Sequence, residues 1–296
     1  MWLKKFCDAD HLPSISGKLR LGTLHEYRKI ERPELRDPKE GTHEWVIDFH
    51  TGVRADIKWL SEISLGAINS PPFGQLSTQA IVGTTITVDL GDYGIRGTLS
   101  VYIDQLHISE ENGNDFTATG LLKFHFSRHN SMILCMSWVD DPSAHLFEDY
   151  NSSWSIELKK RDEFAGWMCR HINQHMSLLQ FDERSLNLLS LGQSSAIRVT
   201  CSNNPVEYRD RKIEVKNRTD LNREMIVSLL RNAEFVKDRK FEAEQEYRFV
   251  FDFDAPSNRG GNQRTRLDTR ESPYFLPIST FGTSFSPTFS RKNNEE

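Results

Sequence analysis

The sequence has 296 residues, of which 37% are hydrophobic, and this is enough for one large domain or two small ones. A formal net charge of -5 with 27% charged residues excludes a strongly basic field, so any binding of nucleic acid must depend on a local basic patch. The cysteines (Cys7, Cys135, Cys169 and Cys201) form no CxxC pair, which argues against a zinc ribbon and a disulfide framework.

Neither a membrane span nor a secretory leader is indicated. No stretch approaches the apolar length that a span requires, and Met1–Phe6 lacks the apolar run of a signal peptide. We therefore expect a cytoplasmic protein with no membrane partner.

The N-terminal segment predicts a short helix, a strand and a loop. Ala9–Ile15 is the expected helix, and Ser16-Gly17 ends it. Lys18–Leu24 alternates polar and apolar residues, as a strand does. Glu31–Gly41 contains two prolines and predicts a loop, with a turn at Asp37–Gly41.

The middle of the chain, residues 44–126, predicts a β-rich segment. Alternating or β-branched runs are expected to form strands at Trp45–Phe49, Ala80–Leu90, Gly97–Ile108 and Thr119–Phe126. Between the first two, Asp56–Ile68 is a candidate helix.

A long apolar run, Ser131–Trp138, predicts a strand buried on both faces. Ser153–Leu158 predicts a further strand, and Arg161–Leu178 a helix with apolar residues at helical spacing. Ala196–Cys201 and Val206–Val215 are expected to pair as strands. Asp220 is expected to cap a helix whose apolar stripe is Leu221, Met225, Ile226, Leu229 and Leu230.

The segment Phe235–Asp254 carries the chemistry that stands out. Tyr247–Phe253 predicts a strand, and continuing its alternation places Glu244, Glu246 and Arg248 on one face. Two carboxylates on one face repel each other unless a cation or a ligand lies between them, so such a pair indicates a site. The alternative is a solvated edge strand in which Arg248 pairs with both glutamates.

Other candidate motifs give weaker indications of a functional site. His171 and His175 have the spacing of metal ligands on a helix, but Ile172 stands where a zincin has glutamate, so we expect an ordinary helix face and no metal. The sequence contains no GxGxxG, Walker A or GxSxG motif. The basic segment Asn258–Arg266 could contact phosphates, or it is an exposed loop.

Three short motifs, in this order, resemble the signature of the cholera-toxin-like ADP-ribosyltransferases: Arg20-Leu21-Gly22-Thr23, Ser137 and Glu244-x-Glu246. That class carries Arg, Ser-Thr-Ser and Glu-x-Glu. The resemblance implies that Glu246 is catalytic, that Glu244 orients the nucleophile of the acceptor, and that Ser137 braces the site.

The same resemblance implies an NAD site, with NAD as substrate. Arg20 and Thr23 would hold the phosphates and the nicotinamide ribose, and Arg28 is the alternative to Arg20. The aromatic residues available to stack on nicotinamide or adenine are Tyr27, Trp138 and Trp154.

A second resemblance covers residues 1–41 and 131–254. Tyr27-Arg28, Asp37-Pro38-x-Glu40-Gly41, Leu134–Ser137 and Glu244-x-Glu246-x-Arg248 are similar to the motifs of a bacterial family of unknown function. Members of that family carry Asn-Asp-Pro-Phe-Glu, Cys-Phe-Ser and Tyr-Glu-x-Glu-x-Arg, and they are similar to ADP-ribosyltransferases. This chain departs from the pattern at Arg36, Lys39 and Met136.

Together these resemblances imply an α+β fold of the ADP-ribosyltransferase-like type. It would have two packed antiparallel sheets that split around a cleft, with flanking helices. Residues 1–282 would form this single domain, with a β-rich insertion at 44–126, and residues 283–296 a disordered tail. Arg20, Ser137 and Glu246 would line the cleft, and the loop Val236–Phe241 would overhang it.

The implied function is mono-ADP-ribosyl transfer from NAD to a macromolecular acceptor, either nucleic acid or protein. By resemblance, such a protein serves as an intracellular toxin in a bacterial toxin–antitoxin or anti-phage system, with an antitoxin protein as partner. Two alternatives stay open. One is a module that binds a nucleotide or a partner without turnover, and the other is a metal-dependent nuclease with Glu40, Glu244 and Glu246 as ligands.

Overall fold

The computed structural model describes residues 1–29, 37–51, 55–67, 84–112, 115–144, 146–176, 181, 197–256, 264–267, 269–270, 272–278 and 287–291. Contacts between residues divide the chain into two compact units. Unit 1 comprises Met1–Glu40, Asn130–Tyr208 and Lys237–Glu296, and unit 2 comprises Gly41–His129 and Arg209–Val236. Each unit has its own hydrophobic core. The predicted insertion at 44–126 therefore lies in unit 2, together with Arg209–Val236.

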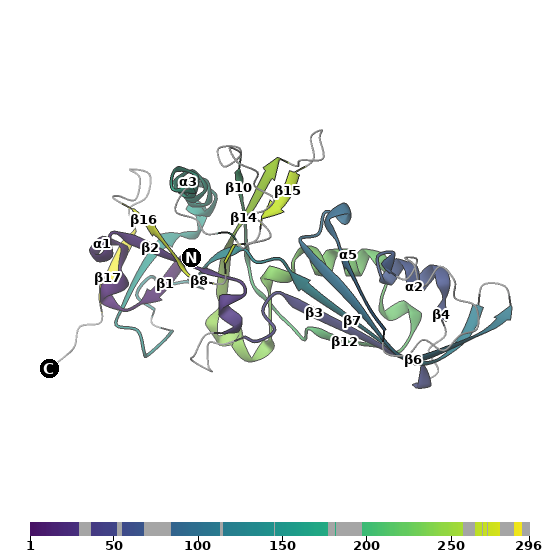
Figure 1. The fold of residues 1–296 in the computed structure, drawn as a ribbon. Coiled ribbons are helices and arrows are strands. Elements are labelled where there is room, and N and C mark those ends of the chain that lie inside the picture. Colours follow the sequence, from purple (N-terminus) through teal and green to yellow (C-terminus); the bar gives the residue numbers. More distant parts are fainter. Residues whose placement is uncertain are drawn as a thin grey trace. The chain divides into compact units, whose positions relative to one another are not determined.

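Unit 1 is built on a sheet whose described strands pair antiparallel throughout. They run in the order β10-β14-β8-β1-β9-β17, with β15 beside β14, β2 beside β8 and β16 beside β2 (Figure 1). Their bounds are β1 (Trp2–Cys7), β2 (Lys18–Thr23), β8 (Met132–Val139), β9 (Ser152–Glu157), β10 (Arg198–Pro205), β14 (Glu246–Pro256), β15 (Arg264–Leu267), β16 (Tyr274–Pro277) and β17 (Thr288–Arg291).

The sheet forks at β8. One edge of β8 pairs with β14 along Met132–Ser137. On the other edge, Met132 and Ile133 pair with β2, whereas Ser137–Val139 pair with β1. The strand is therefore shared by two arms, β2–β16 and β1–β9–β17, and Leu134–Met136 lie where the arms separate. A strand that is paired along one edge and covered on both faces needs a continuous apolar sequence, and this explains the run at 131–138.

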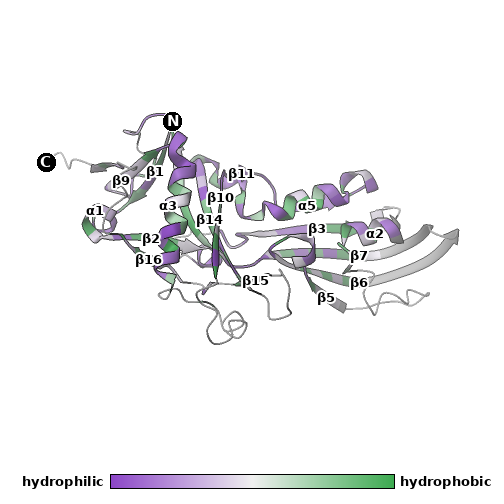
Figure 2. Ribbon diagram, turned by 90° about the horizontal axis from the view of Figure 1, so that it is seen from above, coloured by the Kyte–Doolittle hydropathy of each residue, from purple (hydrophilic) through white to green (hydrophobic). Residues whose placement is uncertain are grey.

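Helix α3 (Arg161–Gln174) covers β10 and β14 of this sheet (Figures 1 and 2). Its side chains Phe164, Met168 and Ile172 are fully buried, in keeping with the helical spacing of its apolar residues. The ring of Phe164 meets that of Phe249 on β14 edge to face, with their centroids 5.2 Å apart. Four aromatic positions of β14 thereby become part of the core: Tyr247, Phe249, Phe251 and Phe253.

Unit 2 has a second sheet, in the order β12-β3-β7-β6-β5, with β4 beside β7. The pair β12–β3 is parallel, and the others are antiparallel. Helices α2 and α5 lie on one face of this sheet. Helix α5 carries both hydrophobic (green) and hydrophilic (purple) residues in Figure 2. The bounds are β3 (Thr42–Asp48), β4 (Ala55–Asp56), α2 (Ile57–Ile63), β5 (Thr84–Asp89), β6 (Gly97–Asn112), β7 (Asp115–Arg128), β12 (Lys212–Val215) and α5 (Arg223–Arg231).

The two chain segments of unit 2 are joined by buried polar contacts. The guanidinium of Arg128 donates from Nε to Glu234 Oε2 at 2.7 Å and from Nη2 to Oε1 at 2.9 Å. In addition, Trp59 Nε1 donates to the carbonyl oxygen of Leu221 at 3.0 Å. A bidentate pair in the interior fixes geometry because either partner left alone would be a costly buried charge.

Short elements connect these layers. Helix α1 spans Pro13–Ser16, and β11 (Glu207–Tyr208) pairs with β13 (Val236–Lys237). The 3-10 turns are η1 (Ala9–His11), η2 (Glu26–Arg28), η3 (Phe49–Thr51), η6 (Gly91–Tyr93), η7 (Leu158–Lys160), η10 (Arg218–Asp220), η11 (Ala233–Phe235) and η12 (Arg239–Glu244). In the described ranges, no helix is both long and apolar enough to cross a membrane.

Several predicted elements need correction. The helix expected at Ala9–Ile15 is two short turns, η1 and α1, because Pro13 begins a new helix. The segments expected to pair, 196–201 and 206–215, do not pair with each other: β10 pairs with β14, and β12 pairs with β3 of unit 2. Of the segment predicted as a disordered tail, Thr288–Arg291 forms β17 against β9, and residues 283–286 and 292–296 lie outside the described residues.

The predicted N-cap of helix α5, Asp220, is also wrong. Asn222 is the N-cap, since its side chain accepts the backbone N–H of Met225 at 2.9 Å. Asp220 instead closes the preceding turn η10 by accepting from the backbone N–H groups of Lys216 and Asn217. Met225, which was expected on the apolar stripe, is 48% exposed.

Candidate active site

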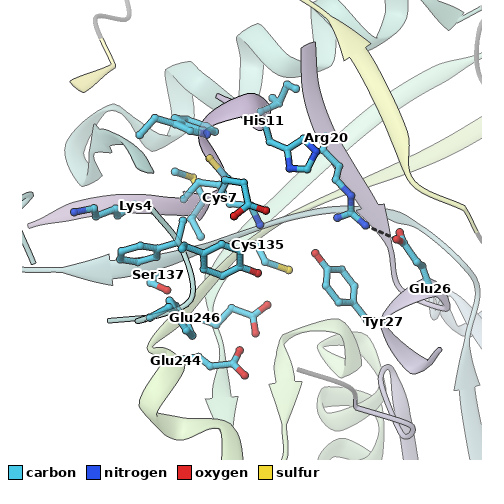
Figure 3. A pocket seen from close by; sticks show the side chains of 18 of the residues that line it. Lys4, Cys7, His11, Arg20, Glu26, Tyr27, Cys135, Ser137, Glu244 and Glu246 are labelled. Carbon is cyan, nitrogen blue, oxygen red and sulfur yellow. Dashed lines mark hydrogen bonds and ion pairs between the residues drawn. The ribbon is translucent and has the colours of Figure 1, made fainter. Parts of the chain in front are cut away.

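A cavity of about 580 Å³ lies in unit 1 where the sheet forks. It is lined by residues of the strands that form the fork, including Lys5 of β1, Arg20 of β2, Cys135 and Ser137 of β8, and Glu246 of β14. Figure 3 shows Arg20, Tyr27, Cys135, Ser137, Glu244 and Glu246 around this one space. Arg20, Ser137 and Glu246, which the sequence predicted to share a cleft, therefore do line one cavity. It lies between the arms of one forked sheet.

Glu246 is the first residue of β14, and the backbone before it fixes its place. Gln245 adopts a left-handed conformation with φ of 46°, so the regular alternation begins only at Glu246. Glu246 lies opposite Ser137 of β8, and its N–H donates to the hydroxyl of Tyr208 at 2.7 Å. Glu244 belongs to the 3-10 turn η12, so the prediction that it lies on the strand is wrong, although it still reaches the cavity.

A chain of buried ion pairs runs through the two glutamates. Lys237 Nζ donates to Glu244 Oε2 at 2.7 Å and to Glu246 Oε2 at 3.0 Å. Arg248 Nε donates to Glu246 Oε1 at 2.6 Å. The two terminal nitrogens of Arg248 donate to the two carboxylate oxygens of Glu40, at 2.7 and 3.1 Å. Because three carboxylates meet two cations, the group carries one negative charge when all its members are ionised.

The alternative of a solvated edge strand is excluded by this geometry. β14 lies between β10 and β8, and Arg248 is 1% exposed. Its guanidinium pairs with Glu246 and Glu40, not with Glu244.

The two glutamates of the pair have opposite pKa shifts. Burial works to raise the pKa of Glu246, but the charges of Arg248 and Lys237 outweigh it and hold this pKa well below its ordinary value. Burial raises the pKa of Glu244 to about 7, because the attraction of Lys237 is offset by repulsion from Glu246. Glu246 is therefore the ionised member of the pair, and Glu244 can take up or release a proton near neutral pH.

Arg20 reaches the cavity from β2. Its guanidinium forms an ion pair with Glu26, and its side chain is 36% exposed. Glu26 also accepts the N–H of Thr23 at 3.1 Å, and the hydroxyl oxygen of Thr23 accepts the N–H of Glu26 at 3.1 Å. Thr23 is fully buried and holds this turn, so it is not a cavity residue. Arg28 also stays outside the lining, since its Nε donates to the carbonyl oxygen of Glu40.

Tyr27 packs against Gly22 of β2. A Cβ atom added at Gly22 would lie 2.8 Å from Cε2 of Tyr27, so the ring occupies the space that a side chain would take. Burial raises the pKa of Tyr27 well above its ordinary value. The phenol is therefore neutral and fixed at the wall of the cavity.

Aromatic side chains form another part of the wall. Of the two tryptophans that the sequence offered as alternatives, Trp154 lines the cavity and is 1% exposed, whereas Trp138 is 40% exposed and is not in the lining. Phe147 and Tyr150, from the segment after β8, line it as well, and their ring centroids lie 6.0 Å apart. Sequence reasoning missed both, because nothing in their local pattern indicates that the segment folds back to the fork.

The carboxylates that a metal-dependent nuclease would use have cationic partners in the structure. In the described part of the chain, no group of three or more His, Cys, Asp or Glu side chains is arranged to hold an ion. The carboxylates proposed for a nuclease, those of Glu40, Glu244 and Glu246, already bond to Lys237 and Arg248. On α3, His175 Nδ1 contacts the backbone oxygen of His171 at 3.0 Å.

Comparison of the chain with protein-family models, with curated proteins and with solved structures found no match.

Proposed function

We propose that unit 1 binds NAD in the cavity and transfers its ADP-ribose to a macromolecular acceptor, with Glu246 facing the nicotinamide ribose. The observation that carries this proposal is the convergence of Arg20, Ser137 and Glu246 on one cavity. They come from three different strands and are separated by more than a hundred residues at each step, in the order that resembles the transferase signature.

The charge state of Glu246 suits the chemistry. Breaking the bond between ribose and nicotinamide passes through a cationic, oxocarbenium-like transition state. A carboxylate that is already ionised and held in place stabilises this charge without reorganisation, and low exposure to water strengthens the interaction. Arg248 and Lys237 keep Glu246 in that form, as the low pKa of its carboxyl group indicates.

Glu244 suits a different task. Its side chain lines the same cavity, and a pKa of about 7 lets it accept a proton from an attacking nucleophile near neutral pH. We assign it to the acceptor side of the reaction.

The remaining lining fits a dinucleotide. Arg20 offers a cationic donor for phosphate oxygens, Lys5 offers a further nitrogen donor, and the rings of Trp154, Phe147 and Tyr150 offer faces for the bases. The volume is within the range of about 300–1,000 Å³ that small-molecule and cofactor sites occupy. The same proposal includes an acceptor that is either nucleic acid or protein, and a role as a toxin restrained by an antitoxin. The basic segment 258–266, which could contact a nucleic-acid acceptor, lies mostly outside the described residues.

A second candidate is a module that binds a nucleotide without turnover. Both oxygens of Glu246 already bond to cations, and Arg20 is paired with Glu26. A site with its charges satisfied in this way can bind a ligand and leave it intact.

The substitution Glu246→Gln separates the two. Nicotinamide release from NAD should fall by about 10²–10³-fold, because the amide keeps the volume but loses the charge. Glu242→Gln is the matched control, since Glu242 is exposed in the same turn η12. Chromatography of nicotinamide, together with mass spectrometry of lysate proteins and nucleic acids incubated with NAD, measures both steps. Wild-type rates in a folded Glu246→Gln protein would contradict the catalytic assignment, and NAD binding without nicotinamide release in the wild type would favour the second candidate.

A further inference from the structure

Lys237 is a buried lysine placed between the two glutamates of the cavity. Its side chain is 6% exposed, and its ammonium group touches Glu244 Oε2 and Glu246 Oε2. The ammonium also lies 4.5 Å from the ring centroid of Phe241, a cation–π contact that limits where it can move. Lys237 was not among the residues that the sequence singled out, because it lies outside the Glu-x-Glu-x-Arg pattern.

We propose that Lys237 is a positioning residue that ties Glu244 to Glu246 and holds Glu246 as a carboxylate facing the cavity. Its contribution to turnover rests on the proposed function, whereas its effect on the two carboxylates does not.

The geometry explains why a cation is needed here. Arg248 contacts Glu246 but divides its guanidinium between Glu246 and Glu40. Among the contacts above, Lys237 is the cation that touches both Glu244 and Glu246. Without it, two buried carboxylates would face each other, and the pair would retain a proton to avoid the repulsion.

The groups that face this pair come from several elements, and within the described ranges Lys237 alone bridges the two carboxylates. The hydroxyl oxygen of Tyr208 accepts the backbone N–H of Glu246. Burial and the charge of Glu246 raise the pKa of the nearby Cys135 thiol, which is therefore neutral. The charged and titratable groups around the two carboxylates are Lys5 on β1, Tyr27 on η2, Cys135 on β8, Tyr208 on β11, Lys237 on β13, Arg248 on β14, and Glu40.

The pKa of Lys237 agrees with this role. Burial works to lower it, but the charges of Glu246 and Glu244 outweigh burial and raise it well above the ordinary value. Lys237 therefore stays protonated across the neutral range and can act as a permanent counter-charge. The ion pair holds down the pKa of both carboxyl groups, so losing it should raise both.

The test is a pH titration of the glutamate carboxylates by ¹³C NMR, with Glu244→Gln and Glu246→Gln used to assign the signals. In Lys237→Met, both titrations should move upward by about one pH unit or more, and Lys237→Arg should restore them most of the way. Lys240→Met is the matched control. Lys240 is exposed, and its ammonium lies 4.7 Å from the centroid of the same Phe241 ring, so this variant should leave both titrations in place.

Removing one partner of a buried pair can unfold a protein. The double variant Lys237→Met with Glu244→Gln keeps the net charge of the group at its original value and can be compared with Glu244→Gln alone. The titration of Glu246 should still lie higher in the double variant. Equal titrations in the two proteins would overturn the role of Lys237.

Turnover is measured separately. The acid limb of the pH–rate profile for nicotinamide release should shift to higher pH in Lys237→Met but not in Lys240→Met. If the wild type releases no nicotinamide, the proposed function fails while the titrations still decide the role of Lys237. If the carboxylate titrations shift in Lys237→Met but the acid limb of the pH–rate profile does not, Lys237 positions the carboxylates without affecting turnover. That result would overturn the proposed contribution of Lys237 to turnover.

Discussion

At the scale of single residues, the geometry of the site depends on which charged side chains form ion pairs with each other. The motif Glu-x-Glu-x-Arg drew attention to Glu246 and Arg248 as a candidate site, because two carboxylates on one face of an aromatic strand repel each other unless a cation or a ligand lies between them. The alternative in which Arg248 pairs with both glutamates is confirmed for Glu246 only, and the pairing with Glu40 was not predicted. The left-handed turn at Gln245 moves Glu244 off the strand, and Arg248 meets Glu40 from a position more than two hundred residues away.

Gly22 is a second feature at this scale, and its prediction concerns stability. Gly22→Ala should destabilise unit 1, because the new methyl group would overlap the Tyr27 ring. In a Tyr27→Ala background the same change should be neutral or stabilising, since alanine suits a strand better than glycine. Urea unfolding of the four proteins of this double-mutant cycle measures the coupling, which should be about 1–3 kcal/mol. Additive effects would show that the ring does not require the glycine.

At the scale of elements, the sequence predicted the strands that have a strong local pattern, but it did not predict how these strands pair. The apolar run at 131–138 and the aromatic run at 247–253 both form strands, β8 and β14. The fork of β8 between β2 and β1 depends on contacts between residues more than a hundred positions apart, which periodicity does not encode. For the same reason the segment 206–215 was paired wrongly: its second half joins β3 as a parallel strand.

Helix α3 gives the prediction at this scale. Phe164 is fully buried, and its ring contacts those of Trp154, Trp167 and Phe249. Phe164→Ala should lower the free energy of unfolding by about 3–5 kcal/mol through lost burial and the resulting cavity. Chemical denaturation measures it, with Glu163→Ala, an exposed neighbour on the same helix, as the control. A loss below about 1 kcal/mol would mean that α3 does not pack on the sheet as described.

At the scale of the whole molecule, the chain builds two units by passing between them more than once. Alternating residues predicted the strands of 44–126, but not that Arg209–Val236 complete the same unit. That addition shows only in contacts such as the Arg128–Glu234 pair, whose partners are 106 positions apart. The candidate site was easier to find than this organisation, because its residues carry chemistry that a core does not need.

On the proposed function, the forked-sheet cavity holds NAD with its nicotinamide ribose beside Glu246. The most direct test is a crystal structure of the protein with a carbocyclic analogue of NAD whose glycosidic bond cannot break. We expect the analogue in the cavity, its pyrophosphate near Arg20 and its nicotinamide ring and carbocycle near Glu246. Density for the analogue elsewhere on unit 1, or an empty cavity in a crystal saturated with it, would contradict the claim.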